Sequence, residues 1–183
     1  MTSPLGEAAT LWTVRLALAG YFLGAALPTR AASSGRRRLD NIAWTVGCFC
    51  YLAHVACAFA FYHHWSHAAA VERTAEQTAL VTGWRWGGGL YVNYVFTAVW
   101  LIDVILRWSP RSAGKARPWW PATAVGMLMW FIVFNATVVF GQGAVRWFGL
   151  AGCLAVPLAR TASRLKMWTI STQVPHSTEE SSE

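Results

Sequence analysis

Charged side chains are scarce in this chain of 183 residues. Asp, Glu, Lys and Arg make up 13% of the sequence, whereas about 25% is usual for a soluble domain. Hydrophobic residues account for 55%, and the mean hydropathy is +0.35. This composition excludes a disordered chain and an ordinary cytosolic enzyme. It predicts an all-α polytopic membrane protein, a bundle of transmembrane helices whose first partner is the lipid bilayer.

The sequence also lacks the motifs of common catalytic and metal-binding frameworks. No phosphate-binding loop, nucleophile elbow or HExxH zinc motif is present. The four cysteines form no CxxC pair and all lie within apolar runs, where a thiol usually behaves as a small hydrophobic side chain. These absences favour a non-enzymatic protein over an enzyme, without a disulfide framework or a structural zinc site.

Four apolar runs are long enough to cross a hydrocarbon core about 30 Å thick, which takes roughly 20 helical residues. A fifth run is shorter, begins beside Arg146 and contains Pro157. This fifth run either crosses the membrane or lies on its surface, so the prediction is four to five transmembrane helices. The predicted spans are residues 8–27, 41–62, 90–108 and 119–140, with 144–159 as the fifth.

Basic residues gather in two of the connectors between these runs. The connector after the first run holds four Arg, and the connector after the third holds three Arg and one Lys. Segment 63–89 has only Arg73 and Arg85, opposed by Glu72 and Glu76. Because Lys and Arg are retained in cytoplasmic loops, we expect a multi-pass protein of the inner (plasma) membrane. Its N-terminus and segment 63–89 then lie outside the cell.

The net charge of +7 arises from these same basic connectors. The basic residues occupy short loops and form no stripe on a soluble domain, so the sequence does not indicate a nucleic-acid partner. Residues 1–166 are expected to form the transmembrane domain. The polar segment 167–183 is expected to be a disordered cytoplasmic tail.

Four predicted spans each carry a polar residue in the outer half of the membrane. At a rise of 1.5 Å per residue, Arg15 and His54 lie about 10 Å from the outer face. Asn93 and Asn135 lie in the same half. An Arg inside the bilayer costs at least about 2.5 kcal/mol, so we expect Arg15 to face the bundle. The cluster then holds the helices together by hydrogen bonds, lets Arg15 reach the headgroups, or binds a small ligand with an anionic or carbonyl group.

The second span leads directly into the sequence His63-His64-Trp65-Ser66-His67. If the helix continues, His63 and His67 share one face, and two imidazoles at this spacing can reach one divalent ion. His64 completes the set of candidate metal ligands. Cysteines and histidines along the second span also admit a copper ion. The candidate cofactor is therefore a divalent metal or copper, and the alternative is a polar belt at the membrane interface.

Residues 68–82 contain no Gly or Pro and predict a helix, which the glycines at 83 and 87–89 end. The leading functional hypothesis is a small binding or accessory protein that holds a metal ion or a small anionic ligand on its outer side. It works alone or as a subunit of a larger membrane complex. The alternative is a small transporter or permease component that uses Arg15, His54, Asn93 and Asn135 as its substrate site.

Overall fold

The computed structural model describes residues 3–26, 34–109 and 119–172. Within these ranges the chain is helical and contains no strand, which confirms the all-α prediction. The helices are α1 (Pro4–Ala26), α2 (Ser34–Phe61), α3 (His67–Thr82), α4 (Gly89–Trp108), α5 (Trp119–Phe134), the π-helical segment η2 (Asn135–Val139) and α6 (Gly143–Thr172).

Three helices in the described part of the chain are long and apolar enough to cross a membrane. They are α1, the stretch Arg38–Phe61 of α2, and α4. The apolar stretch Thr123–Val139 of α5 and η2 is shorter. The fifth predicted run forms part of α6, a continuous helix of 30 residues that accommodates Pro157. Because α6 ends at Thr172, it includes the first residues of the predicted tail.

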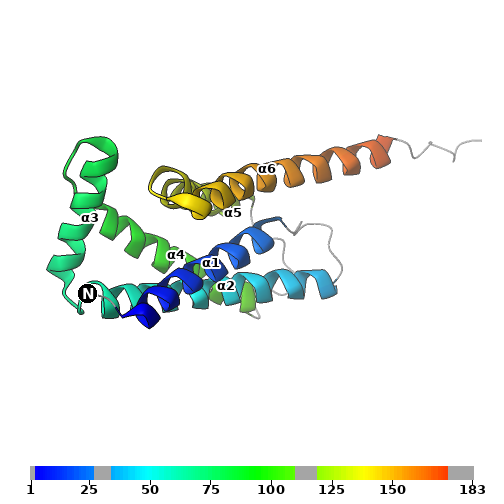
Figure 1. The fold of residues 1–183 in the computed structure, drawn as a ribbon. Coiled ribbons are helices and arrows are strands. Elements are labelled where there is room, and N and C mark those ends of the chain that lie inside the picture. The colour runs from blue at the N-terminus through cyan, green and yellow to red at the C-terminus, as the bar shows by residue number, and fades with distance from the viewer. Residues whose placement is uncertain (1–2, 27–33, 110–118, 173–183) are drawn as a thin grey trace, which may run out of the picture.

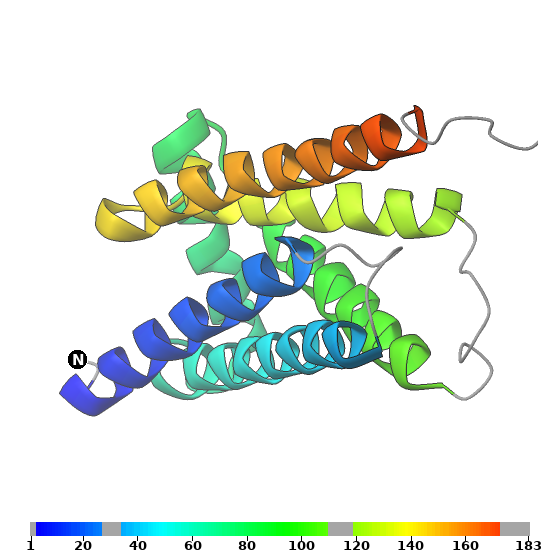
Figure 2. The ribbon, with the colours of Figure 1, turned by 90° about the vertical axis from the view of Figure 1, so that its right-hand side faces the viewer.

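Helix α2 runs lengthwise through the molecule, α1 and α4 cross it obliquely, and α3 stands across one end (Figures 1 and 2). We call this end the α3 end. The opposite end, where α4 finishes after Arg107, is the Arg107 end. Helix α1 begins at the α3 end, and α2 returns beside it in the antiparallel direction (Figure 2).

Helices α1 and α2 approach each other closely where two glycines meet. A Cβ atom added to Gly20 would lie 2.6 Å from the Cα atom of Gly47, a distance that no real side chain tolerates. Small residues at such positions let membrane helices pack backbone against backbone. The α1–α2 hairpin is therefore specified by these two glycines.

An aromatic cluster fills the centre of the bundle. Trp100 of α4 is 2% exposed, and four rings from α1, α2 and α4 have centroids 5.3 to 6.0 Å from its own. These rings belong to Tyr21, Trp44, Tyr51 and Phe96.

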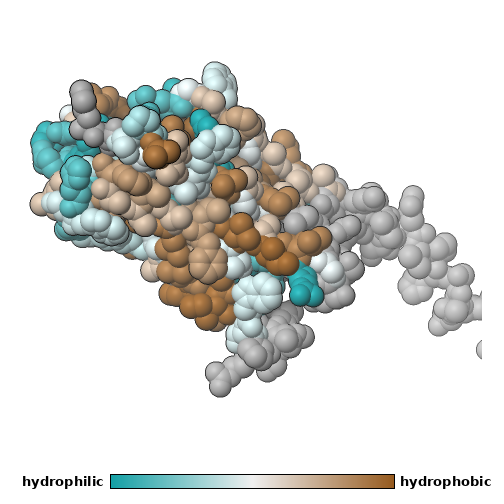
Figure 3. All heavy atoms as spheres, turned by 60° about the horizontal axis from the view of Figure 1, so that its bottom comes forward, coloured by the Kyte–Doolittle hydropathy of each residue, from teal (hydrophilic) through white to brown (hydrophobic). Residues whose placement is uncertain are grey.

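Apolar side chains also cover the outside of the helices. Figure 3 shows a broad hydrophobic surface along the sides, with hydrophilic residues gathered at the α3 end. Large apolar residues such as Leu23, Ile105 and Leu158 are more than half exposed. A bilayer solvates such a surface without penalty, whereas water does not.

Candidate functional site

The segment between α2 and α3 is a tight turn. His64 and Trp65 have φ angles of 47° and 59°, in the left-handed region that ends a right-handed helix. The hydroxyl of Ser66 then accepts a hydrogen bond of 3.2 Å from the backbone N–H of Ala69 and caps α3. The condition for a shared helical face, that the second span continues as a helix through His67, is therefore not met.

This turn removes the geometric basis for the predicted metal site. His63, His64 and His67 do not share one helical face, because the left-handed residues separate them. In the part of the chain that the structure describes, no group of three or more His, Cys, Asp or Glu is placed to hold a metal ion. Burial and the charge of Arg73 lower the pKa of His63, so its imidazole stays neutral to lower pH than an exposed histidine.

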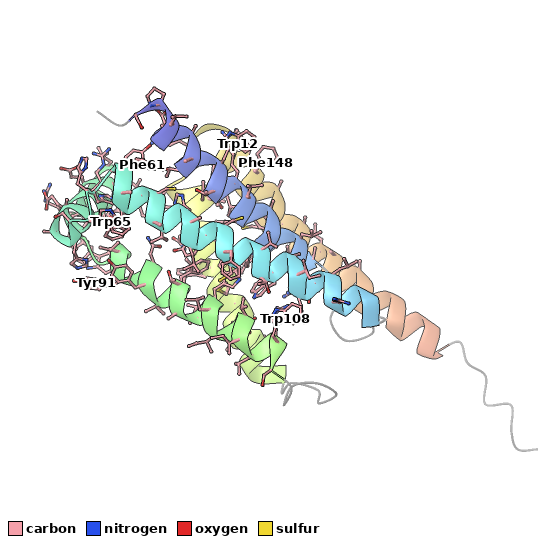
Figure 4. All side chains as sticks on the ribbon, turned by 90° about the horizontal axis from the view of Figure 1, so that it is seen from below. Trp12, Phe61, Trp65, Tyr91, Trp108 and Phe148 are labelled. Atoms are coloured by element: carbon pink, nitrogen blue, oxygen red, sulfur yellow. The ribbon has the colours of Figure 1, made fainter. Side chains whose placement is uncertain are left out.

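Arg15 lies on the outside of the bundle. Its side chain is exposed, and its guanidinium carbon lies 5.1 Å from the ring centroid of Trp12. Figure 4 shows Trp12 at the periphery of the helices. The expectation that Arg15 faces the interior is wrong, and the contact is a cation–π pair on the surface.

The other three residues of the predicted cluster share no partner. Nδ1 of His54 lies 3.0 Å from the carbonyl oxygen of Thr10 and so joins α2 to α1. The side-chain amide of Asn135 donates to the carbonyl of Phe131 in its own helix, at 2.8 Å. Among the described residues, no hydrogen bond or ion pair joins any two of Arg15, His54, Asn93 and Asn135.

Asn93 instead lines a small cavity inside the bundle. The cavity measures about 90 Å³, which is room for a few water-sized molecules. Tyr21, Tyr51 and Trp100 form part of its wall, and η2 contributes Thr137. We call this space the central cavity.

A larger hollow opens between α4 and α5, which contact each other only sparsely. It measures about 710 Å³, and we call it the lateral groove. Ile132 lines both the lateral groove and the central cavity. The groove residues are Val71 of α3, Trp86, Gly87 and Gly88 of the connecting segment, Tyr91, Val92 and Val95 of α4, and Leu128, Phe131 and Ile132 of α5.

The segment after α3 closes the groove at the α3 end. Gly83 has a φ of 77° and caps α3, which confirms the break predicted there. A Cβ at Gly87 would lie 2.8 Å from the carbonyl oxygen of Val71, so only glycine lets the segment rest on α3. An ion pair between Arg85 and Glu72 holds the same segment from outside.

A polar cluster borders this closed end. The imidazole of His67 lies between two tyrosines of α4: Nδ1 is 3.1 Å from the hydroxyl of Tyr94, and Nε2 is 3.5 Å from the hydroxyl of Tyr91. Tyr91 also lines the groove, and Figure 4 shows it at the start of α4. An apolar hollow therefore ends beside hydrogen-bonding groups.

The Arg107 end contains an ion cluster that the sequence patterns did not reveal. Nε of Arg107 donates to Asp103 at 2.8 Å, and Nη1 donates to Asp40 of α2 at 3.0 Å. The guanidinium lies 4.5 Å from the ring centroid of Trp44. Both carboxylate side chains are 5% exposed, so the cluster is buried. In the sequence, only the i, i+4 spacing of Asp103 and Arg107 indicated part of this cluster, and no pattern pointed to Asp40.

The lateral groove has apolar walls with a few polar groups at one end, an arrangement typical of a small-molecule site. The central cavity is about an eighth of its volume. No family model, curated protein or solved structure matches this chain.

Proposed function

We propose that this protein is a multi-pass membrane protein that binds the hydrocarbon chain of a membrane-dissolved molecule in the lateral groove. It acts as a binding or accessory protein and not as an enzyme. The observation that carries the proposal is the groove itself, whose volume of about 710 Å³ lies within the usual range of roughly 300–1,000 Å³ for ligand sites. We propose this ligand instead of the metal ion or small anion expected from the sequence, because the residues predicted to hold those ions are dispersed.

The exposed walls of the groove support a hydrocarbon occupant. Val95 of α4 and Phe131 of α5 are 53% and 59% exposed, and Leu128 is 38% exposed. An acyl or isoprenoid chain lying against these residues fills the space between the helices and gains dispersion contacts on both sides. Because the groove opens sideways between two apolar helices, a molecule already dissolved in the bilayer can enter it.

We place five spans in the inner (plasma) membrane, with the N-terminus and α3 outside. Gly143 to Arg160 of α6 covers about 26 Å at 1.5 Å per residue, close to the thickness of the hydrocarbon core. Nε of Arg160 donates to the carbonyl of Ala25 at the end of α1, at 3.0 Å. Arg160 and Arg107 therefore lie at the same end of the bundle, as the retention of basic residues in the cytoplasm favours.

Photolabelling tests chain binding directly. The probe is an 18-carbon hydrocarbon with a diazirine in the middle of the chain, added to the full-length protein in detergent micelles. We expect adducts on Val95, Leu128 or Phe131 when labelled peptides are mapped by mass spectrometry. Leu128→Trp fills the groove and is expected to abolish these adducts.

The matched control is Met127→Trp. Met127 is the neighbour of Leu128 on α5, is 68% exposed and lies outside the groove. This variant adds the same bulk to the lipid-facing surface and is expected to leave the labelling unchanged. Uniform labelling of exposed apolar residues, or an equal effect of the two variants, would contradict the proposal.

The central cavity favours a second candidate function, passage of a small polar molecule through the bundle. The side chain of Asn93 and the hydroxyl-bearing Tyr21 and Thr137 line this space. The two functions are separable, because Leu128 lines the groove and not the central cavity. If the protein conducts, Leu128→Trp removes chain binding and leaves glycerol flux into proteoliposomes intact.

A further inference from the structure

The cluster of His67, Tyr91 and Tyr94 leaves one tyrosine O–H free, whichever tautomer the imidazole adopts. A neutral imidazole has one N–H donor and one bare nitrogen. If Nε2 carries the proton, it donates to Tyr91, and the O–H of Tyr91 is available to another acceptor. If Nδ1 carries it, it donates to Tyr94, whose O–H is then the free one, and Tyr91 can donate to the bare Nε2 only across 3.5 Å, the outer limit of a hydrogen bond.

The hydroxyl of Tyr91 is therefore the donor that a molecule in the groove can engage. Of the two tyrosines, Tyr91 is the one that lines the groove, and its hydrogen bond to His67 is long, at 3.5 Å, in both tautomers. The distance of 3.1 Å between His67 and Tyr94 is the firmer contact and holds the imidazole in place. A guest with an oxygen acceptor at the end of its chain gains a hydrogen bond at this position.

The formal charges of the arginine and glutamate side chains in the segment 67–94, which closes the groove, cancel. Residues 67–94 contain two basic and two acidic side chains. Arg73 pairs with Glu76 at 3.2 Å, and Arg85 pairs with Glu72. A carboxylate or phosphate head would need a cation beyond these pairs, since an anion gains most from a charge-assisted donor.

From these observations we propose that the groove selects an uncharged amphiphile whose head carries an oxygen acceptor, such as an ester or ketone, and that Tyr91 donates to that oxygen. This inference rests on the proposed function. It adds the head chemistry of the ligand to the chain binding argued above.

Competition against the photoreactive hydrocarbon tests the inference. Three competitors share an 18-carbon chain and differ in the head: methyl oleate is an uncharged acceptor, oleate is anionic, and 1-octadecene has no head. Their potencies are compared between the wild-type protein and Tyr91→Phe, so that partition into the detergent cancels. Methyl oleate is expected to lose about fivefold in Tyr91→Phe, the ratio given by one neutral hydrogen bond.

The control variant is Tyr62→Phe, an exposed tyrosine beyond the end of α2, which is expected to leave all three potencies unchanged. The potency of 1-octadecene is expected to be the same in every variant. An unchanged methyl oleate potency in Tyr91→Phe would overturn the inference, and so would oleate as the strongest competitor. If the proposed function itself is wrong, 1-octadecene will displace no label from the groove. This result distinguishes that failure from a failure of the inference about the head group.

Discussion

At the Arg107 end, a guanidinium whose side chain is 20% exposed joins α2 to α4 through two carboxylates that are each 5% exposed. At the α3 end, the corresponding ion pair of Glu72 and Arg85 is 56% and 59% exposed. Breaking a buried pair leaves an uncompensated charge, whereas an exposed pair is replaced by water at little cost. One end is thus fixed by strong, directional contacts, and the other, which is held by exposed contacts, is the more adaptable.

The largest expected effect comes from removing the charge at the fixed end. Arg107→Ala leaves Asp40 and Asp103 buried without this partner and is expected to lower the free energy of unfolding by about 3 kcal/mol. Denaturant titration in detergent, followed by far-ultraviolet circular dichroism, measures the loss. Arg73→Ala at the α3 end breaks an exposed pair and is expected to cost less than about 1 kcal/mol. Equal losses in the two variants would refute the comparison.

The close approach of α1 and α2 predicts a smaller effect. Gly20→Ala forces a methyl group against the backbone of Gly47, and overpacking of this kind costs about 2 kcal/mol. The same titration measures it. Gly35→Ala is the control, because nothing lies within 4 Å of a Cβ there. We expect it to be neutral or stabilising, since alanine favours a helix over glycine; a comparable loss in both variants would show that space is not the cause.

The smallest expected effect is at the adaptable end and stays local. Ser66→Ala removes the side-chain cap of α3 and is expected to cost about 1 kcal/mol. Hydrogen exchange measured by mass spectrometry should show faster exchange in α3 and unchanged exchange in α2. Ser109 ends α4 through its backbone N–H, which bonds Leu106, so Ser109→Ala is expected to change neither. Acceleration throughout the molecule would mean that the two ends unfold together.

Most of the helices could be predicted from the sequence. The apolar runs 8–27, 41–62 and 90–108 correspond to α1, α2 and α4, because only a helix satisfies every backbone group in hydrocarbon. Helix α3 was predicted because residues 68–82 contain no glycine or proline, and its end was predicted from the glycine at position 83. These features depend on neighbours along the chain, and local composition decides them.

The site depends on features that composition does not fix. Depth in the membrane follows from residue counting, but the angular position of Arg15 depends on how α1 is rotated against its neighbours, and the side chain faces outward. The turn at His64 and Trp65 adopts left-handed angles without a glycine to mark it. Asp40 and Arg107 are separated by 67 positions in the sequence. The groove arises from the spacing of α4 and α5, which no motif encodes.

Ile132 faces two compartments, the lateral groove on one side and the central cavity on the other, and is 7% exposed. Because this residue is common to both linings, a change in the size of its side chain alters the two spaces together. A larger side chain at position 132 narrows both, and a smaller one enlarges both. Leu128 and Asn93 each line one space alone, so the groove and the cavity can be altered separately only at positions such as these.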